Sequence, residues 1–120
     1  MNENSVVEIT NADNIAVVAF KETSISNTEG IAAASEKIKQ YIHESQPNAI
    51  VIDFSRVKFF SSQVLGLLLE IRAELKTYDA NVVISAIEPQ LHRVFKITNL
   101  DKIFEFFPDK ESAFKALNEK

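Results

Sequence analysis

The sequence predicts an α/β protein with a mixed, mainly parallel sheet of about five strands and about four helices. Short apolar runs alternate with longer segments in which apolar residues recur every three or four positions, which gives the order β-β-α-β-α-β-α-β-α. The runs Ile15–Phe20 and Ala49–Phe54 are apolar almost throughout, as in strands that are covered on both faces. The polar segment Asn11–Asn14 predicts a turn between the first two strands, so the sheet is expected to begin with an antiparallel hairpin.

The first half of the chain is expected to contribute three strands and one helix. Thr28 is the expected N-cap of this helix, and Pro47 ends it because the residue before a proline disfavours helical backbone. The apolar face of the helix is expected to be Ile31, Ala34, Ile38, Tyr41 and Ile42. The expected order is a strand at Val6–Thr10, the turn, a strand at Ile15–Phe20, a loop at Lys21–Asn27, the helix capped by Thr28 and ended by the segment 45–48, and a strand at Ala49–Phe54.

The second half follows the same alternation. A helix is expected from Ser61 or Ser62 to about Thr77, and Pro89 opens the next one because proline fits the first helical turn. Their apolar faces are expected to be Val64, Leu65, Leu67, Leu68, Leu69, Ile71 and Leu75 in the first and Leu91, Val94, Phe95 and Ile97 in the second. The other expected elements are a turn at Tyr78–Asn81, a strand at Val82–Ala86, a break at Thr98–Asp101, a strand at Ile103–Phe107, and a last helix from Pro108 with Ala113, Phe114 and Leu117 inward.

Composition and charge narrow the classes of function. The 120 residues suit one domain, which we expect to span residues 1–120. The net charge of −4 argues against a nucleic-acid partner, and the sequence has neither a basic amphipathic stretch nor an apolar run long enough to cross a membrane. There is no cysteine, and the polar N-terminal segment lacks the features of a signal peptide, so we expect a cytoplasmic protein.

The motifs of common enzymes are missing from the sequence. The two glycines, Gly30 and Gly66, belong to no phosphate-binding loop. The two histidines, His43 and His92, lie on different predicted helices, where a surface position is the ordinary one. Neither a metal-ligand spacing nor a nucleophile-elbow motif occurs. We therefore expect no enzymatic activity, no metal and no cofactor.

One stretch, Ile50–Leu69, combines a buried strand, a polar corner and a pair of serines. The strand ends at Asp53, and Ser61 and Ser62 then open a helix, where backbone N–H groups lack intrahelical partners. A serine there can cap the helix, which contributes about 1 kcal/mol, and capping alone would explain one serine. A phosphate can also bind at a helix N-terminus, and phosphorylation there would add charge without disturbing the fold. The residues alone leave both interpretations open.

The same stretch resembles the signature of STAS domains, the anti-sigma factor antagonist fold. The family pattern is an apolar strand, then D-hydrophobic-S-x-V-x-F, then a helix start similar to D-S-S-G-L-G. The residues that match it are Asp53, Phe54, Ser55, Val57 and Phe59 in the first part and Ser62, Leu65 and Gly66 in the second. The segment from Ile87 to Leu117 resembles the C-terminal half of the family, so the resemblance extends from about Val6 to Leu117.

The resemblance implies a STAS fold and a switchable binding protein, an anti-sigma factor antagonist. In this family the unphosphorylated antagonist binds an anti-sigma factor that is also a serine kinase. The kinase phosphorylates a serine of the antagonist, which breaks the complex, and a serine phosphatase reverses this step. By position Ser62 matches the phosphoacceptor, and Ser61 is the alternative. The implied partner-binding residues are Ser61, Ser62, Gln63, Phe60, Phe59 and Asn27, with one ring of the phenylalanine pair expected to be exposed.

The sequence departs from the family pattern at polar positions. Ser61 stands where an acidic residue is usual, while Gln63 and Val64 replace a serine or threonine and a glycine. Asn27 is the nearest match to an aspartate that is common after the second strand. Two other functions therefore stay open. One is a STAS interaction or scaffold domain that works without phosphorylation in a signalling or transport assembly. The other is a small enzyme or ligand-binding domain, which would need a sizeable pocket.

Overall fold

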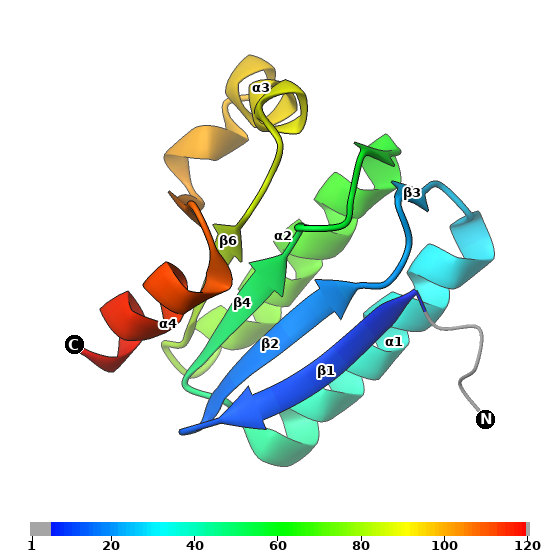
Figure 1. The fold of residues 1–120 in the computed structure, drawn as a ribbon. Helices are drawn as coiled ribbons and strands as arrows, with labels where there is room; N and C mark the ends of the chain where they lie inside the picture. Colours follow the sequence, from blue (N-terminus) through cyan, green and yellow to red (C-terminus); the bar gives the residue numbers. More distant parts are fainter. Residues whose placement is uncertain (1–5, 120) are drawn as a thin grey trace.

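A computed structural model describes residues 6–119 and confirms the predicted α/β architecture (Figure 1). The strands are β1 (Val7–Ala12), β2 (Ile15–Phe20), β3 (Ser24–Ile25), β4 (Ala49–Asp53), β5 (Phe59–Phe60), β6 (Asn81–Ser85) and β7 (Glu105–Phe107). The helices are α1 (Thr28–Ser45), α2 (Ser62–Lys76), α3 (Pro89–Ile97) and α4 (Lys110–Asn118), with a 3₁₀ turn, η1, at Leu100–Lys102. Five strands form the main sheet in the order β1-β2-β4-β6-β7; β1 and β2 are antiparallel, and the other neighbours are parallel.

Helices cover both faces of the main sheet. Helices α1 and α2 lie on one face and α4 lies on the other (Figure 1). Strand β4 shows the consequence, because Ile50 and Ile52 join the core under α1 and α2 while Ala49 and Val51 join the smaller core under α4. Because both faces of β4 are buried, its residues before Asp53 are all apolar and do not alternate between apolar and polar types.

A small second sheet was not predicted from the sequence. It pairs β3 with β5 in parallel; β3 lies in the predicted loop Lys21–Asn27, and no strand was predicted at Phe59–Phe60. The backbone N–H groups of Phe59 and Ser61 donate to the carbonyls of Thr23 (3.1 Å) and Ile25 (2.9 Å), respectively. Strands of two residues are too short to show a hydrophobic period, so only the pairing of distant segments reveals them.

Three apolar residues are more exposed than the sequence predicted. Leu69 is exposed because it lies at the edge of the buried stripe of α2, one turn beyond Leu65. Ile97 is 74% exposed at the end of α3, although it was expected on the apolar face of that helix. Ile103 is also exposed, and β7 begins two residues after it, at Glu105, rather than at Ile103 as predicted.

Two further features of residues 6–119 bear on function. None of the helices in this part of the chain is long and apolar enough to cross a membrane. The same residues include no group of three or more acidic or histidine side chains that could hold a metal ion.

Candidate functional site: the corner at the start of two helices

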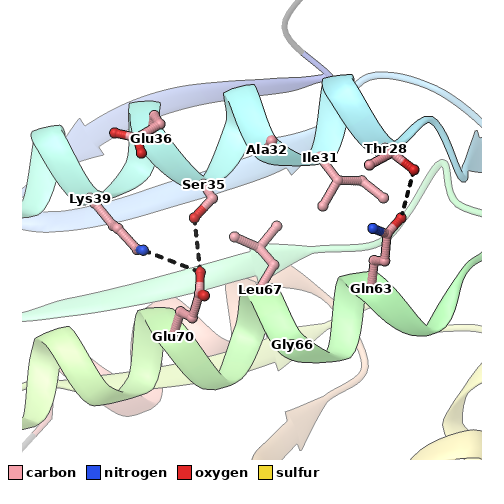
Figure 2. A pocket seen from close by; sticks show the side chains of 10 residues that line it. All are labelled: Thr28, Ile31, Ala32, Ser35, Glu36, Lys39, Gln63, Gly66, Leu67 and Glu70. Atoms are coloured by element: carbon pink, nitrogen blue, oxygen red, sulfur yellow. Dashed lines mark hydrogen bonds and ion pairs between the residues drawn. The ribbon is translucent and has the colours of Figure 1, made fainter.

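The N-terminal ends of α1 and α2 meet at one corner of the molecule. We use "the corner" for Asn27 and Thr28 together with the segment Phe59–Gln63. Pairing of β3 with β5 brings these segments together, and Thr28 Oγ1 donates a hydrogen bond to Gln63 Oε1 at 3.2 Å (Figure 2). A helix carries a partial positive charge at its N-terminus, so two such charges lie side by side here.

Ser61 occupies the N-cap position of α2 but does not cap it with its side chain. Its backbone is extended, as an N-cap requires, and its carbonyl accepts from the N–H of Val64 at 3.0 Å. Its Oγ is buried and has no hydrogen-bond partner within residues 6–119. The expectation that a serine hydroxyl caps this helix is therefore wrong for Ser61, since its hydroxyl forms no hydrogen bond with the free N–H groups.

Ser62 is the exposed member of the pair. It is the first residue of α2, and its side chain faces solvent. The backbone N–H groups of Ser62 and Gln63 donate no hydrogen bond to any residue in the described part of the chain. The accessible hydroxyl of Ser62 thus lies beside two backbone N–H groups that have no partner in this part of the chain.

The two phenylalanines of β5 have opposite environments. Phe59 is 53% exposed, whereas Phe60 is 6% exposed and packs against Phe54 and Phe95 at ring-centroid distances of 5.7 and 6.1 Å. The expectation that one ring is exposed is confirmed. Phe60 was also placed among the partner-binding residues, but its ring supports the corner from inside the core and leaves Phe59 as the aromatic group at the surface.

Asn27, rather than Thr28, is the N-cap of α1. Asn27 Oδ1 accepts a hydrogen bond from the N–H of Gly30 at 2.7 Å, which corrects the predicted cap by one residue. Asparagine is among the most favoured N-cap residues, and Thr28 is then free to bond to Gln63. Asn27 is exposed at the corner, but the oxygen of its side-chain amide already accepts a hydrogen bond from the backbone of α1.

A charged pair connects the corner to α3. Lys58 Nζ bonds to Glu88 Oε2, and Glu88 is the N-cap residue of α3. The hydrogen bond from Lys58, followed by the favourable charge interaction with it, lowers the pKa of the Glu88 carboxyl below its ordinary value. Lys58 therefore links the segment before Phe59 to the N-terminus of α3.

A groove between α1 and α2 extends from the corner (Figure 2). It has a volume of about 470 Å³. Farther along it, Glu70 Oε1 accepts from Ser35 Oγ at 3.0 Å and pairs with Lys39 Nζ at 3.3 Å. The hydrogen bonds from Ser35 and Lys39, in that order of size, lower the pKa of Glu70. Its lining residues are Thr28, Ile31, Ala32, Ser35, Glu36, Lys39, Gln63, Gly66, Leu67 and Glu70.

The sequence did not single out this groove. Its paired residues are more than 30 positions apart, as in Ser35 and Glu70, and each lies on the polar side of its own helix. Only the parallel packing of α1 against α2 brings them together. A short polar pattern on one helix carries no information about the partner helix, so no local signal could have identified them.

Comparisons with known proteins give matches to one protein family and to solved structures with the same fold. The STAS domain family profile matches residues 7–113. The anti-sigma factor antagonist SpoIIAA in its unphosphorylated form superposes with a TM-score of 0.85 at 17% identity, covering 95% of this chain and 97% of that one. An anti-sigma factor antagonist from Mycobacterium paratuberculosis gives 0.81 at 26% identity, with 97% of each chain covered. A SulP transporter STAS domain from Vibrio cholerae gives 0.69 at 19% identity, covering 92% of this chain and 86% of that one.

Proposed function

This chain belongs to the STAS domain family, and on that premise we propose that it is an anti-sigma factor antagonist that binds its partner through the corner. The observation that carries the proposal is the exposed hydroxyl of Ser62 at the open N-terminus of α2, next to the exposed ring of Phe59. The similarity to the mycobacterial antagonist, which extends over 97% of both chains, supports this role. Large aromatic residues at a surface are common anchors of protein interfaces, which fits Phe59 as a contact residue.

The proposed partner is an anti-sigma factor that is also a serine kinase, and phosphorylation of Ser62 ends the complex. Ser62 is preferred over Ser61 because a kinase needs an accessible hydroxyl, and Ser61 Oγ is buried. A phosphate adds about −1.5 to −2 charges, which the N-terminal ends of α1 and α2 would stabilise on this chain. A partner surface packed on Ser62 would have to bury that charge, so binding weakens. A serine phosphatase would restore the binding form, and the cycle would take place in the cytoplasm.

The test uses the anti-sigma factor that co-purifies with this chain from its native cell. The chain is incubated with that protein and ATP, and its intact mass is measured. Wild type and the matched control Ser61→Ala should each gain one phosphate, whereas Ser62→Ala should gain none. Ser62→Asp should weaken binding to the partner, and Ser62→Ala should retain it. Equal affinities of Ser62→Asp and Ser62→Ala would contradict the proposed role of charge.

A second candidate is a STAS interaction domain that binds constitutively. Two observations favour it. Ser61 and Asn27 stand where acidic residues are usual in the family, and the side-chain oxygen of Asn27 already caps α1. In that case no phosphate appears on either serine in the kinase experiment. Phe59→Ala would still weaken the partner complex, so this variant separates a binding corner from a phosphorylated one.

A further inference from the structure

A second hollow lies away from the corner, on the face of the main sheet that α4 covers. We call it the cationic pocket; its volume is about 280 Å³. It lies where β2 and β4 end, because Ala19 and Asp53 are paired near the carboxyl ends of these parallel strands. In open α/β sheets, the carboxyl ends of the strands are the usual location of ligand crevices. Its lining residues are Glu8, Ala19, Phe20, Lys21, Asp53, Ser55, Arg56 and Lys110.

Three cationic side chains line this pocket and outnumber its two carboxylates, Glu8 and Asp53. Lys21, Arg56 and Lys110 form no ion pair within residues 6–119. The only side-chain hydrogen bond among them is from Arg56 Nη1 to the Lys21 carbonyl, at 3.4 Å. Lys110 is also the first residue of α4, so the positive end of that helix adds to the field. Unpaired cations that face one hollow attract an anion.

A nearly buried carboxylate opens into the same pocket. Asp53 is 6% exposed, and its Oδ1 accepts a hydrogen bond from the N–H of Ser55 at 2.9 Å. Its other carboxylate oxygen has no hydrogen-bond partner in the described part of the chain. Asp53 also lines the pocket, so this oxygen is an acceptor to which a bound molecule with a hydroxyl group could donate.

From this geometry we infer that the cationic pocket binds a small phosphate ester that carries hydroxyl groups, such as a sugar monophosphate. The phosphate lies among Lys21, Arg56 and Lys110, where the guanidinium can bind two of its oxygens at once. A hydroxyl of the ligand donates to the free oxygen of Asp53. The volume of about 280 Å³ is near the lower end of the roughly 300–1,000 Å³ of typical ligand pockets, which favours a small ligand. This site is separate from Ser62, so it stands or falls independently of the proposed phosphorylation.

The inference is tested by titrating the isotope-labelled chain and recording backbone amide NMR shifts at constant ionic strength. The probes are ribose 5-phosphate, inorganic phosphate and ribose. We expect saturable shifts at Lys21, Ser55, Arg56 and Lys110 with ribose 5-phosphate. Inorganic phosphate should bind about tenfold more weakly, the size of one hydrogen bond to a charged group, and ribose should not bind measurably. An absence of saturable shifts, or shifts spread over the whole surface, would overturn the proposal.

Variants identify which side chains act. Arg56→Gln and Lys110→Gln should each weaken binding of ribose 5-phosphate about tenfold or more. Lys115→Gln is the matched control, because Lys115 is exposed on the same helix but does not line the pocket. Asp53→Asn should remove the preference for the ester over inorganic phosphate. Equal effects of the Lys110 and Lys115 variants, or equal binding of ribose 5-phosphate and inorganic phosphate by wild type, would refute the proposed binding site. Both comparisons can be made even if the Asp53→Asn variant does not fold.

Discussion

The N-cap residues of α1 and α2, Asn27 and Ser61, are both of types favoured at this position, but their side chains should contribute differently to the free energy of unfolding. Asn27 Oδ1 lies 2.7 Å from the N–H of Gly30, whereas Ser61 Oγ is buried and makes no hydrogen bond within residues 6–119. Loss of a capping side chain costs about 1 kcal/mol, so Asn27→Ala should lower the free energy of unfolding by roughly that amount. Ser61→Ala removes a buried hydroxyl without a partner, which contributes no hydrogen bond and has already lost its hydration. We therefore expect a change below about 0.5 kcal/mol for Ser61→Ala.

Urea unfolding followed by circular dichroism measures this difference. For a slope of about 2 kcal/mol per molar urea, Asn27→Ala should lower the midpoint by about 0.5 M and Ser61→Ala by less than about 0.25 M. Ser26→Ala is the matched control, since Ser26 is exposed beside the α1 cap and makes no side-chain hydrogen bond in the described part of the chain. If Asn27→Ala and Ser61→Ala lose equal stability, the Ser61 hydroxyl caps α2 in solution and the difference inferred from the structure is wrong.

Three further predictions concern the corner and the groove beside it. Phe59→Ala should weaken partner binding by about tenfold or more, measured by calorimetry, and unchanged affinity would exclude Phe59 as an anchor. Because Phe59 is 53% exposed, the substitution should destabilise the fold by less than the roughly 3–5 kcal/mol lost when a fully buried phenylalanine is replaced by alanine. The Glu70 pKa is lowered by Ser35 and then Lys39, so its contribution to stability is present above its ordinary value of 4.5 and lost as pH falls through the folded value. Glu70→Gln should flatten the decline of the thermal midpoint below that pH, and an unchanged acid profile would contradict this. Gly66→Ala should raise the free energy of unfolding by about 0.5–1 kcal/mol in urea, since Gly66 lies inside α2 and a methyl group there meets no atom within 4 Å; a loss of stability would show that the groove is tighter in solution.

The order of the elements could be predicted because it depends on local patterns. Apolar runs such as Ile15–Phe20 identified strands covered on both faces, and three- and four-residue spacing identified the helices. The pairing of β3 with β5 could not be predicted, because a strand as short as Ser24–Ile25 has no period and depends on a partner 35 residues away. The burial of individual apolar residues also escaped local patterns. Ile97 fits the helical spacing of α3, but it is the last residue of that helix and is exposed.

The local structure of the candidate site was predicted in part. The sequence placed a serine pair at a helix start, and the structure agrees, with Ser61 as N-cap and Ser62 as first helical residue. The difference between the two hydroxyls was not predictable, because it depends on side-chain rotamers and on what covers each oxygen. The shift of the α1 cap from Thr28 to Asn27 is of the same kind, since both residue types can cap a helix. In the structure Asn27 caps α1, while Thr28 bonds to Gln63 on the neighbouring helix. Local chemistry thus predicts where a helix begins more reliably than which hydroxyl stays accessible.

The geometry of the corner also explains why a phosphate could act on a partner without unfolding this chain. A phosphate on Ser62 would lie beside the unused N–H groups of Ser62 and Gln63 and near the positive ends of α1 and α2. Negative charge at a helix N-terminus is stabilising, by about 0.3–1 kcal/mol at an exposed site. The same charge buried under a partner would lose its hydration, which is far more costly. If Ser62 is phosphorylated as proposed, the folded chain would tolerate both forms of this residue while the docked complex would tolerate only one, and a binding switch needs that asymmetry.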